Sequence, residues 1–370
     1  MKLRTLLVVM ALSLSVVLGV GTTQAAEPVG AVYTMSNAAS GNSVLVFKRK
    51  INGSLQSAGV FATGGLGTDG GLGNQSAVVL DQSDRWLFVV NAGSHEISVF
   101  EVHAEGLQHI ETTASGGFRP ISLALHDNLL YVLHAGGNIG EVDNITGFRV
   151  RPAGTLMPLS DSTRPLSEAV TDPAQIAFTP DGSVLVVTEK STNRLVTYTV
   201  GRNGRPGEPI IHDSAGTTPF GFAFGKRSQL LISEAFGGAP DASAVSSYTV
   251  SRQGDLQVIS PSVGTTQTAA CWVVITNDGR FAYVTNTGSG SISSYTISFD
   301  GGLTLLNALA GETGPGSGPI DVDLTNDGRF LYALSSAGGK IDAFLVQPRG
   351  GLTPLPGVTV PIGSNGLAAR

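Results

Sequence analysis

TNDGRFAYVTNTGSGSISSYTIS, Thr276 to Ser298, recurs with small changes as TNDGRFLYALSSAGGKIDAFLVQ, Thr325 to Gln347. Each copy contains an Asn-Asp-Gly turn, an apolar strand, a turn of small residues and a strand of alternating pattern. Asn-Asp-Gly between two apolar runs is a strong hairpin signal, because Gly adopts the positive φ that tight turns require. The pair of copies therefore indicates a repeated antiparallel β unit.

The same frame runs along the whole chain. It recurs in Leu80 to Val102 and Thr179 to Val200, and in weaker form in Ala31 to Arg49, Leu125 to Gly137 and Gly225 to Gly238. The centres of the second strands fall roughly 43 to 55 residues apart, at Tyr33, Phe88, Tyr131, Val186, Leu231, Tyr283 and Tyr332. Such a period is typical of a propeller blade.

Composition fits this architecture. Gly makes up 49 of the 370 residues and only 14% of residues are charged, as expected for many short strands joined by tight turns. We expect one all-β domain over residues 26–370: a seven-bladed β-propeller with four-stranded antiparallel blades. The first copy lacks a leading strand, and the chain ends in GSNGLAAR, so Gly366 to Arg370 should form the innermost strand of the first blade and close the ring.

The first 25 residues differ from the rest. Lys2 and Arg4 precede an apolar run from Leu6 to Val20, and small residues follow, which predicts a signal peptide cleaved after Ala25 or Ala26. The mature chain would carry a net charge of −8 and no membrane span, which does not suit binding to nucleic acid. We expect an exported monomer, periplasmic or secreted.

Several motifs have an ordinary structural explanation. GLGTDG, Gly65 to Gly70, matches a dinucleotide-binding pattern, but no helix is expected after it, so it is interpreted as an inter-blade loop. The six His residues show no zinc-binding spacing, and Cys271 lies in an apolar strand as a buried thiol. The sequence therefore predicts no metal and no cofactor.

Function is instead indicated by position in the repeat. In a propeller the first strands line the channel, and the loops that enter them and leave the second strands share one face. The acid/base candidates on this face are Glu189 and Glu234, with His134 assisting. Ligand-binding candidates are Gln175, Arg119, Phe220, Trp272, Asn91 and Asn286.

The frame P-x-x-x-x-F-x-P-[DN]-G with a following V-x-[NE], as in PAQIAFTPDGSVLVVTE (Pro173 to Glu189), resembles the seven-bladed lactonase-type propellers. That family includes 6-phosphogluconolactonases and carboxy-muconate lactonizing enzymes. The resemblance covers all seven repeats and implies a site formed by Pro-Arg-His, Asn-Glu and Pro-Arg-Gly-Phe motifs.

This sequence departs from those motifs. Ala174 and Gln175 stand where the family has Arg and His, Thr188 precedes Glu189 in place of Asn, and Phe220 replaces the second Arg. Gln cannot exchange a proton near neutral pH, and Phe cannot bind an anion as Arg does. We therefore expect hydrolysis or isomerisation of a neutral lactone. The alternative is a non-catalytic propeller that binds a ligand or a protein partner on the same face.

Overall fold

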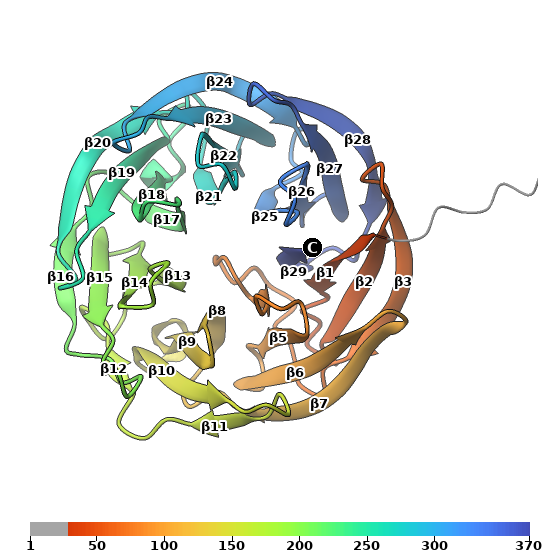
Figure 1. The fold of residues 1–370 in the computed structure, drawn as a ribbon, viewed down its shortest axis with the longest axis vertical. Helices are drawn as coiled ribbons and strands as arrows, with labels where there is room; N and C mark the ends of the chain where they lie inside the picture. Colours follow the sequence, from red (N-terminus) through yellow and green to blue (C-terminus); the bar gives the residue numbers. More distant parts are fainter. Residues whose placement is uncertain (1–28) are drawn as a thin grey trace, which may run out of the picture.

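The computed structural model describes residues 29–370, which form a ring of seven antiparallel sheets around a central channel (Figure 1). Each residue that marked a repeat lies in the second strand of its own blade, as predicted. The all-β, seven-bladed fold is confirmed. The proposed signal peptide lies outside the described residues.

The strands of each blade are given from the channel outward, and the innermost strand of blade 1 comes from the C-terminal end of the chain. Blade 1 contains β29 (Asn365–Ala369), β1 (Gly30–Met35), β2 (Ser43–Arg49) and β3 (Leu55–Ala62). Blade 2 contains β4 (Val78–Leu80), β5 (Trp86–Asn91), β6 (Glu96–His103) and β7 (Gly106–Ala114). Blade 3 contains β8 (Pro120–His126), β9 (Leu129–Ala135), β10 (Asp143–Val150) and β11 (Leu156–Pro158), with a short extra strand β12 (Arg164–Pro165) on β10. Blade 4 contains β13 (Pro173–Phe178), β14 (Val184–Glu189), β15 (Arg194–Thr199) and β16 (Ile210–Asp213).

Each of the remaining three blades is built from four consecutive strands of the chain. Blade 5 contains β17 (Pro219–Phe224), β18 (Gln229–Glu234), β19 (Ala244–Val250) and β20 (Leu256–Gly264). Blade 6 contains β21 (Ala270–Ile275), β22 (Phe281–Asn286), β23 (Ser291–Ile297) and β24 (Leu303–Glu312). Blade 7 contains β25 (Pro319–Leu324), β26 (Phe330–Ser335), β27 (Lys340–Val346) and β28 (Leu352–Thr359).

Two short 3-10 helices, η1 (Gly136–Ile139) and η2 (Phe236–Gly238), follow second strands. Within residues 29–370 no helix has the length and apolar character needed to cross a membrane.

Ring closure follows the predicted route. β29 pairs with β1 through Val32 and Ala369, and the amide of Arg370 donates to the carbonyl of Ala31 at 2.9 Å. The carboxylates of Asp321 and Asp323 on β25 accept the amides of Leu367 (3.0 Å) and Ala369 (2.8 Å), which joins blade 7 to blade 1. The last strand is therefore held from both sides.

The core lies between blades. Tyr131 and Tyr332, from the second strands of blades 3 and 7, are fully buried. Their hydroxyls each donate, at 2.7 Å, to a turn carbonyl of the next blade, Gly204 and Gly53 respectively. The positive φ of these two glycines (83° each) suits this turn. A repeated position thus provides a repeated contact between blades.

Candidate functional site

The disc has two faces with different chemistry. We call the face where first strands begin and second strands end the loop face; Pro173 pairs with Glu189 there, and Pro219 with Glu234. The opposite face, which carries the turns between first and second strands, is the turn face. All the candidate residues predicted from sequence belong to blade ends on the loop face.

Glu189 is fully buried and its carboxylate is engaged. One oxygen accepts the amide of Ser167 at 2.8 Å, and the other accepts the hydroxyls of Ser167 and Thr192 (2.6 Å to Thr192). Ser167 lies in the linker that precedes blade 4, and Thr192 in the turn between β14 and β15. The carboxylate therefore fastens the blade to its own linker.

Glu234 occupies the equivalent position one blade further on and is also fully buried. Its oxygens accept the hydroxyls of Ser246 and Ser262, the latter at 2.6 Å. Burial raises the pKa of Glu234, while these hydroxyls and the amide of Gly216 lower it. Glu189 and Glu234 share no hydrogen-bond partner.

The polar side chains at the ends of other second strands are also hydrogen-bonded within the protein. His134 contacts the hydroxyl of Ser115 in the linker before blade 3 (3.0 Å), and burial lowers its pKa to about 4. The amides of Asn91 and Asn286 donate to serines of the adjacent third strands. These buried side chains are thus bonded to serines of a linker or of the third strand of their own blade.

Gln175 joins two blades. Its amide nitrogen donates to the carbonyl of Phe222 (3.0 Å) and its oxygen accepts the amide of Phe222 (2.6 Å). Both polar atoms of the side chain are therefore used in bridging the first strands of blades 4 and 5.

An unpredicted element closes the loop-face end of the channel. The linker between β3 and β4 covers residues 63–77, whereas the linkers before blades 3, 5 and 6 cover only 115–119, 214–218 and 265–269. We call residues 72–76 the plug. They lie at the centre of the ring, where Figure 1 shows an orange loop. GLGTDG is thus an inter-blade loop, as interpreted from sequence, and the residues after it enter the channel.

The plug is hydrogen-bonded to three other blades. The amide of Gln75 donates to the carbonyl of Ala174 in blade 4 (3.2 Å), and its side chain bonds the backbone of Val273 in blade 6. Ser76 accepts the amide of Leu123 in blade 3 at 2.9 Å, and Trp272 donates its indole N–H to the carbonyl of Asn74. The plug therefore blocks passage along the axis.

A charged and aromatic cluster surrounds the plug on the loop face. Lys190 Nζ donates to the carbonyl of Gly73 (2.7 Å), lies 3.3 Å from the carboxylate of Asp172 and sits 4.7 Å from the centre of the Phe220 ring. The Phe220 and Trp272 rings are 5.1 Å apart. We call Asp172, Lys190, Phe220, Trp272 and Arg119 the mouth cluster.

Arg119 belongs to this cluster because its charge acts on Lys190. Burial lowers the pKa of Lys190, the neighbouring carboxylate of Asp172 raises it, and the charge of Arg119 lowers it. The Nε of Arg119 is buried and has no hydrogen-bond partner within residues 29–370. Arg119, Phe220 and Trp272 were singled out from sequence. Lys190 and Asp172 were missed, although each is adjacent to a motif residue, Glu189 and Pro173.

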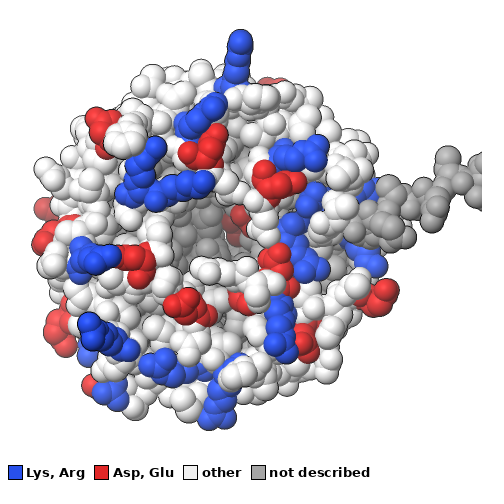
Figure 2. Space-filling model, in the orientation of Figure 1, with Lys and Arg blue, Asp and Glu red and all other residues white. Residues whose placement is uncertain are grey.

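The turn-face end of the channel stays open. A cavity of about 310 Å³ reaches from this face to Gln75 and is lined by Asp321, Asp323 and Leu367, and a second of about 390 Å³ shares Gln75 and Asp323 with it. Figure 2 shows the central hollow on this face. Burial raises the pKa of Asp323 to about 7.

No group of three or more His, Cys, Asp or Glu side chains in residues 29–370 is arranged to hold a metal ion. Cys271 is buried, and burial raises the pKa of its thiol to about 12.

Comparison with protein families gives a match to a family with the same seven-bladed fold. The model described as "Lactonase, 7-bladed beta-propeller" matches residues 32–170 and 242–365, well over half of the chain. The chain belongs to this lactonase family. The match omits residues 171–241, which hold Gln175 and Phe220, where the sequence departs from the family's motifs, and Glu189, where it keeps the motif residue.

Solved structures share the fold at low identity. A periplasmic gluconolactonase of Pseudomonas aeruginosa superposes with a TM-score of 0.70 at 17% identity, covering 92% of this chain and 98% of that one. A protein of Bacteroides fragilis gives 0.72 at 18% identity, with the same two coverages. One from Lactobacillus plantarum gives 0.73 at 17% identity, covering 92% and 99%. A search of curated proteins finds no match.

Proposed function

We propose that this lactonase-family propeller is exported and hydrolyses a small neutral lactone at the mouth cluster. The observation that carries the proposal is the convergence of Lys190, Asp172 and Phe220 over the plug, at the centre of the face where functional groups gather in propellers. Family membership and the periplasmic gluconolactonase among its structural relatives support the substrate class.

The roles follow from exposure. The side chain of Asp172 is 43% exposed, whereas Glu189 and Glu234 are fully enclosed by hydrogen-bond donors. Asp172 is the general base that takes a proton from the attacking water. As the bond from the carbonyl carbon to the ring oxygen breaks, that oxygen takes the proton and a hydroxy acid is formed.

The cations and the rings complete the site. Arg119 and Lys190 stabilise the negative charge that develops on the carbonyl oxygen, and Phe220 offers an apolar surface to the lactone ring. Lys190 is only 9% exposed, so a ligand meets Asp172, Arg119 and Phe220 first. Glu189 and His134 then act by holding the linkers that carry Asp172 and Arg119, and Glu234 acts by holding the linker that precedes Phe220.

An assay of a panel of neutral lactones tests this assignment. Asp172→Asn should lower kcat/KM by about a hundredfold or more, the usual cost of removing a general base. Asp241→Asn, an exposed carboxylate on the same face of blade 5, should leave the rate unchanged. If Glu189→Gln abolishes turnover in a stably folded protein while Asp172→Asn does not, the roles revert to the buried acids.

A non-catalytic ligand-binding propeller is the second candidate. It is favoured because both carboxylate oxygens of Glu189 and of Glu234 already accept hydrogen bonds from the protein. Absence of turnover for every lactone in the panel, together with saturable binding that Phe220→Ala weakens, would establish this alternative.

A further inference from the structure

The backbone of Asp172 has an unusual conformation at the edge of the mouth cluster. Its φ is 47°, in the left-handed region that is uncommon for residues other than Gly. The first strand of blade 4 begins at the next residue, and the amide of Lys190 donates to the carbonyl of Asp172 at 3.2 Å. Such a conformation persists only where surrounding bonds hold the backbone.

Asp143, the first residue of β10 in blade 3, provides further bonds of this kind. It is 1% exposed, and one carboxylate oxygen accepts both the amide (2.6 Å) and the hydroxyl (2.9 Å) of Thr171, the residue before Asp172. The other oxygen accepts the amide of Gly137 in η1 at 2.8 Å. The amide of Asp143 donates to the carbonyl of Ala169 (2.9 Å). One buried carboxylate therefore fastens the linker before blade 4 to a loop of blade 3.

Asn138 reaches Asp172 directly from the same loop. Its side-chain amide donates to Oδ1 of Asp172 at 3.2 Å, and the ammonium group of Lys190 lies 3.3 Å from the same oxygen. Oδ2 of Asp172 accepts no hydrogen bond from residues 29–370. One oxygen of the carboxylate is therefore held, and the other remains to take a proton.

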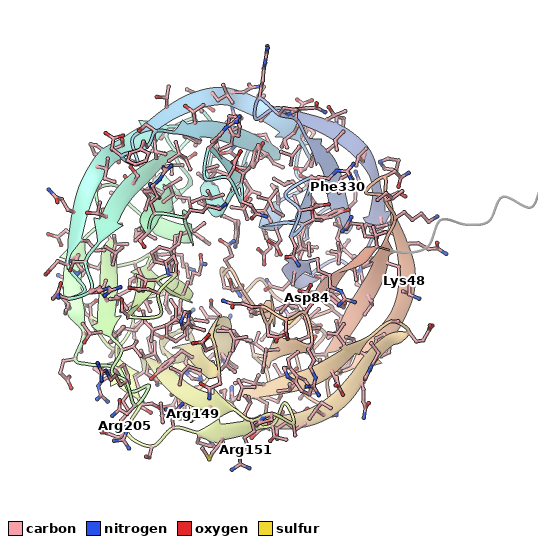
Figure 3. All side chains as sticks on the ribbon, in the orientation of Figure 1. Lys48, Asp84, Arg149, Arg151, Arg205 and Phe330 are labelled. Carbon is pink, nitrogen blue, oxygen red and sulfur yellow. The ribbon has the colours of Figure 1, made fainter. Side chains whose placement is uncertain are left out.

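The strand β10 spans the depth of the disc. Asp143 begins it at the loop face, and Arg149 lies near its other end on the turn face, where it is labelled in Figure 3. The Nη2 of Arg149 donates to the carbonyl of Asn203 in blade 4 at 2.7 Å. Both ends of the strand thus bond blade 4, but only the loop-face end reaches the linker that carries Asp172.

We propose that Asp143 and Asn138 are positioning residues for the general base Asp172; this inference rests on the proposed lactonase activity. Asp143 fixes the backbone that carries Asp172, and Asn138 fixes Oδ1, so that Oδ2 takes the proton from the attacking water. Both residues act through Asp172 rather than on the lactone. A base held in one orientation raises kcat without changing how tightly the lactone binds.

Steady-state kinetics on a lactone that the panel identifies tests both roles. Asn138→Ala should lower kcat by about 3- to 10-fold, the effect of losing one hydrogen bond, with KM changed by less than about twofold. Asp143→Asn should lower kcat by about 10- to 100-fold, because an amide at this position cannot accept all three donors. Arg149→Gln, which removes a bond between the same two blades, should leave kcat and KM unchanged.

Combining each substitution with Asp172→Asn separates positioning from a general loss of structure. In the Asp172→Asn protein the base is already absent, so neither Asn138→Ala nor Asp143→Asn should slow the residual turnover further. Slowing by the same factor with and without the Asp172 carboxylate would overturn the proposal.

Hydrogen exchange gives a readout that needs no substrate. The amide of Thr171 should exchange at least about tenfold faster in Asp143→Asn than in the unaltered protein or in Arg149→Gln, because it loses its carboxylate acceptor. Unchanged exchange in a protein that still hydrolyses the lactone would overturn the role of Asp143 alone. Faster exchange in a protein that turns over no lactone would instead refute the proposed function, and with it the catalytic purpose of these bonds.

Discussion

Side chains in a propeller face the neighbouring blades. A strand directs its side chains along the normal of its sheet, and in a ring of radial sheets that normal points to the next blade. Thr188 and Glu189 show the two directions: the Thr188 hydroxyl donates to the carbonyl of Phe220 in blade 5 (2.6 Å), whereas Glu189 reaches Ser167. A carboxylate at the end of a second strand is therefore well placed to fasten a linker.

Gln175→Ala should destabilise the ring by about 1 to 3 kcal/mol, because the buried amide and carbonyl of Phe222 would each lose a partner. Urea unfolding followed by tryptophan fluorescence measures this change. Gln56→Ala, at an exposed position of β3, should be neutral. Equal midpoints for the two variants would show that the bridge contributes nothing.

The sequence repeat was sufficient to predict every blade, but it could not predict the hydrogen-bond partners of individual side chains. Asp-Gly turns and the spacing of Tyr33, Tyr131, Tyr283 and Tyr332 are local signals, so strands and ring closure could be predicted. Whether Gln175 faces a ligand or Phe222 depends on the bulge between Pro173 and Gln175, because a shift of one residue reverses the side-chain direction.

At the scale of elements, the linker between β3 and β4 departs from the repeat. Asn37, buried at the end of β1 with φ of 53°, donates to the carbonyl of Gly70 (2.7 Å) and accepts the amide of Thr68. An added Cβ on Gly67 would lie 2.1 Å from the backbone of Asn37. The length and Gly content of residues 63–77 were the signals that could have revealed the plug.

The seam between β25 and β29 should make stability depend on pH. Burial raises the pKa of Asp323 from 3.8 to about 7, so the folded state holds a proton that the unfolded chain releases. The stabilisation is complete below about pH 4 and is lost as pH rises through 7, by about 4 kcal/mol in all.

The comparison of the unaltered protein with Asp323→Asn removes this carboxyl, together with the charge that helps to raise the pKa of its neighbour Asp321. His134 acts in the opposite direction, because its lowered pKa favours folding at higher pH, and it is common to both proteins. The free energy of unfolding of the unaltered protein, relative to the variant, should fall between pH 4.5 and 7.5. A constant difference over this range would contradict the raised pKa.

At the scale of the whole molecule, the ring is closed by a strand from the far end of the chain. Deletion of residues 366–370 removes Leu367 from the core beside blade 7 and opens the pairing of β29 with β1. We expect a loss of at least about 4 kcal/mol in the free energy of unfolding, from the lost apolar burial and backbone hydrogen bonds together.

Urea denaturation measures this loss, with Ile362→Ser as the control, since Ile362 is 77% exposed just before the closing strand. A truncated chain that unfolds at the midpoint of the intact protein would show that blade 1 does not need its innermost strand.

The plug turns the channel into a dead end. Because Gln75 and Ser76 are bonded to blades 3, 4 and 6, a solute that enters from the turn face has to leave by the same opening. Molecules at the mouth cluster and in the turn-face cavities therefore exchange only through bulk solvent. A ligand bound at the mouth cluster should therefore not change the rate at which a second ligand enters the turn-face cavities.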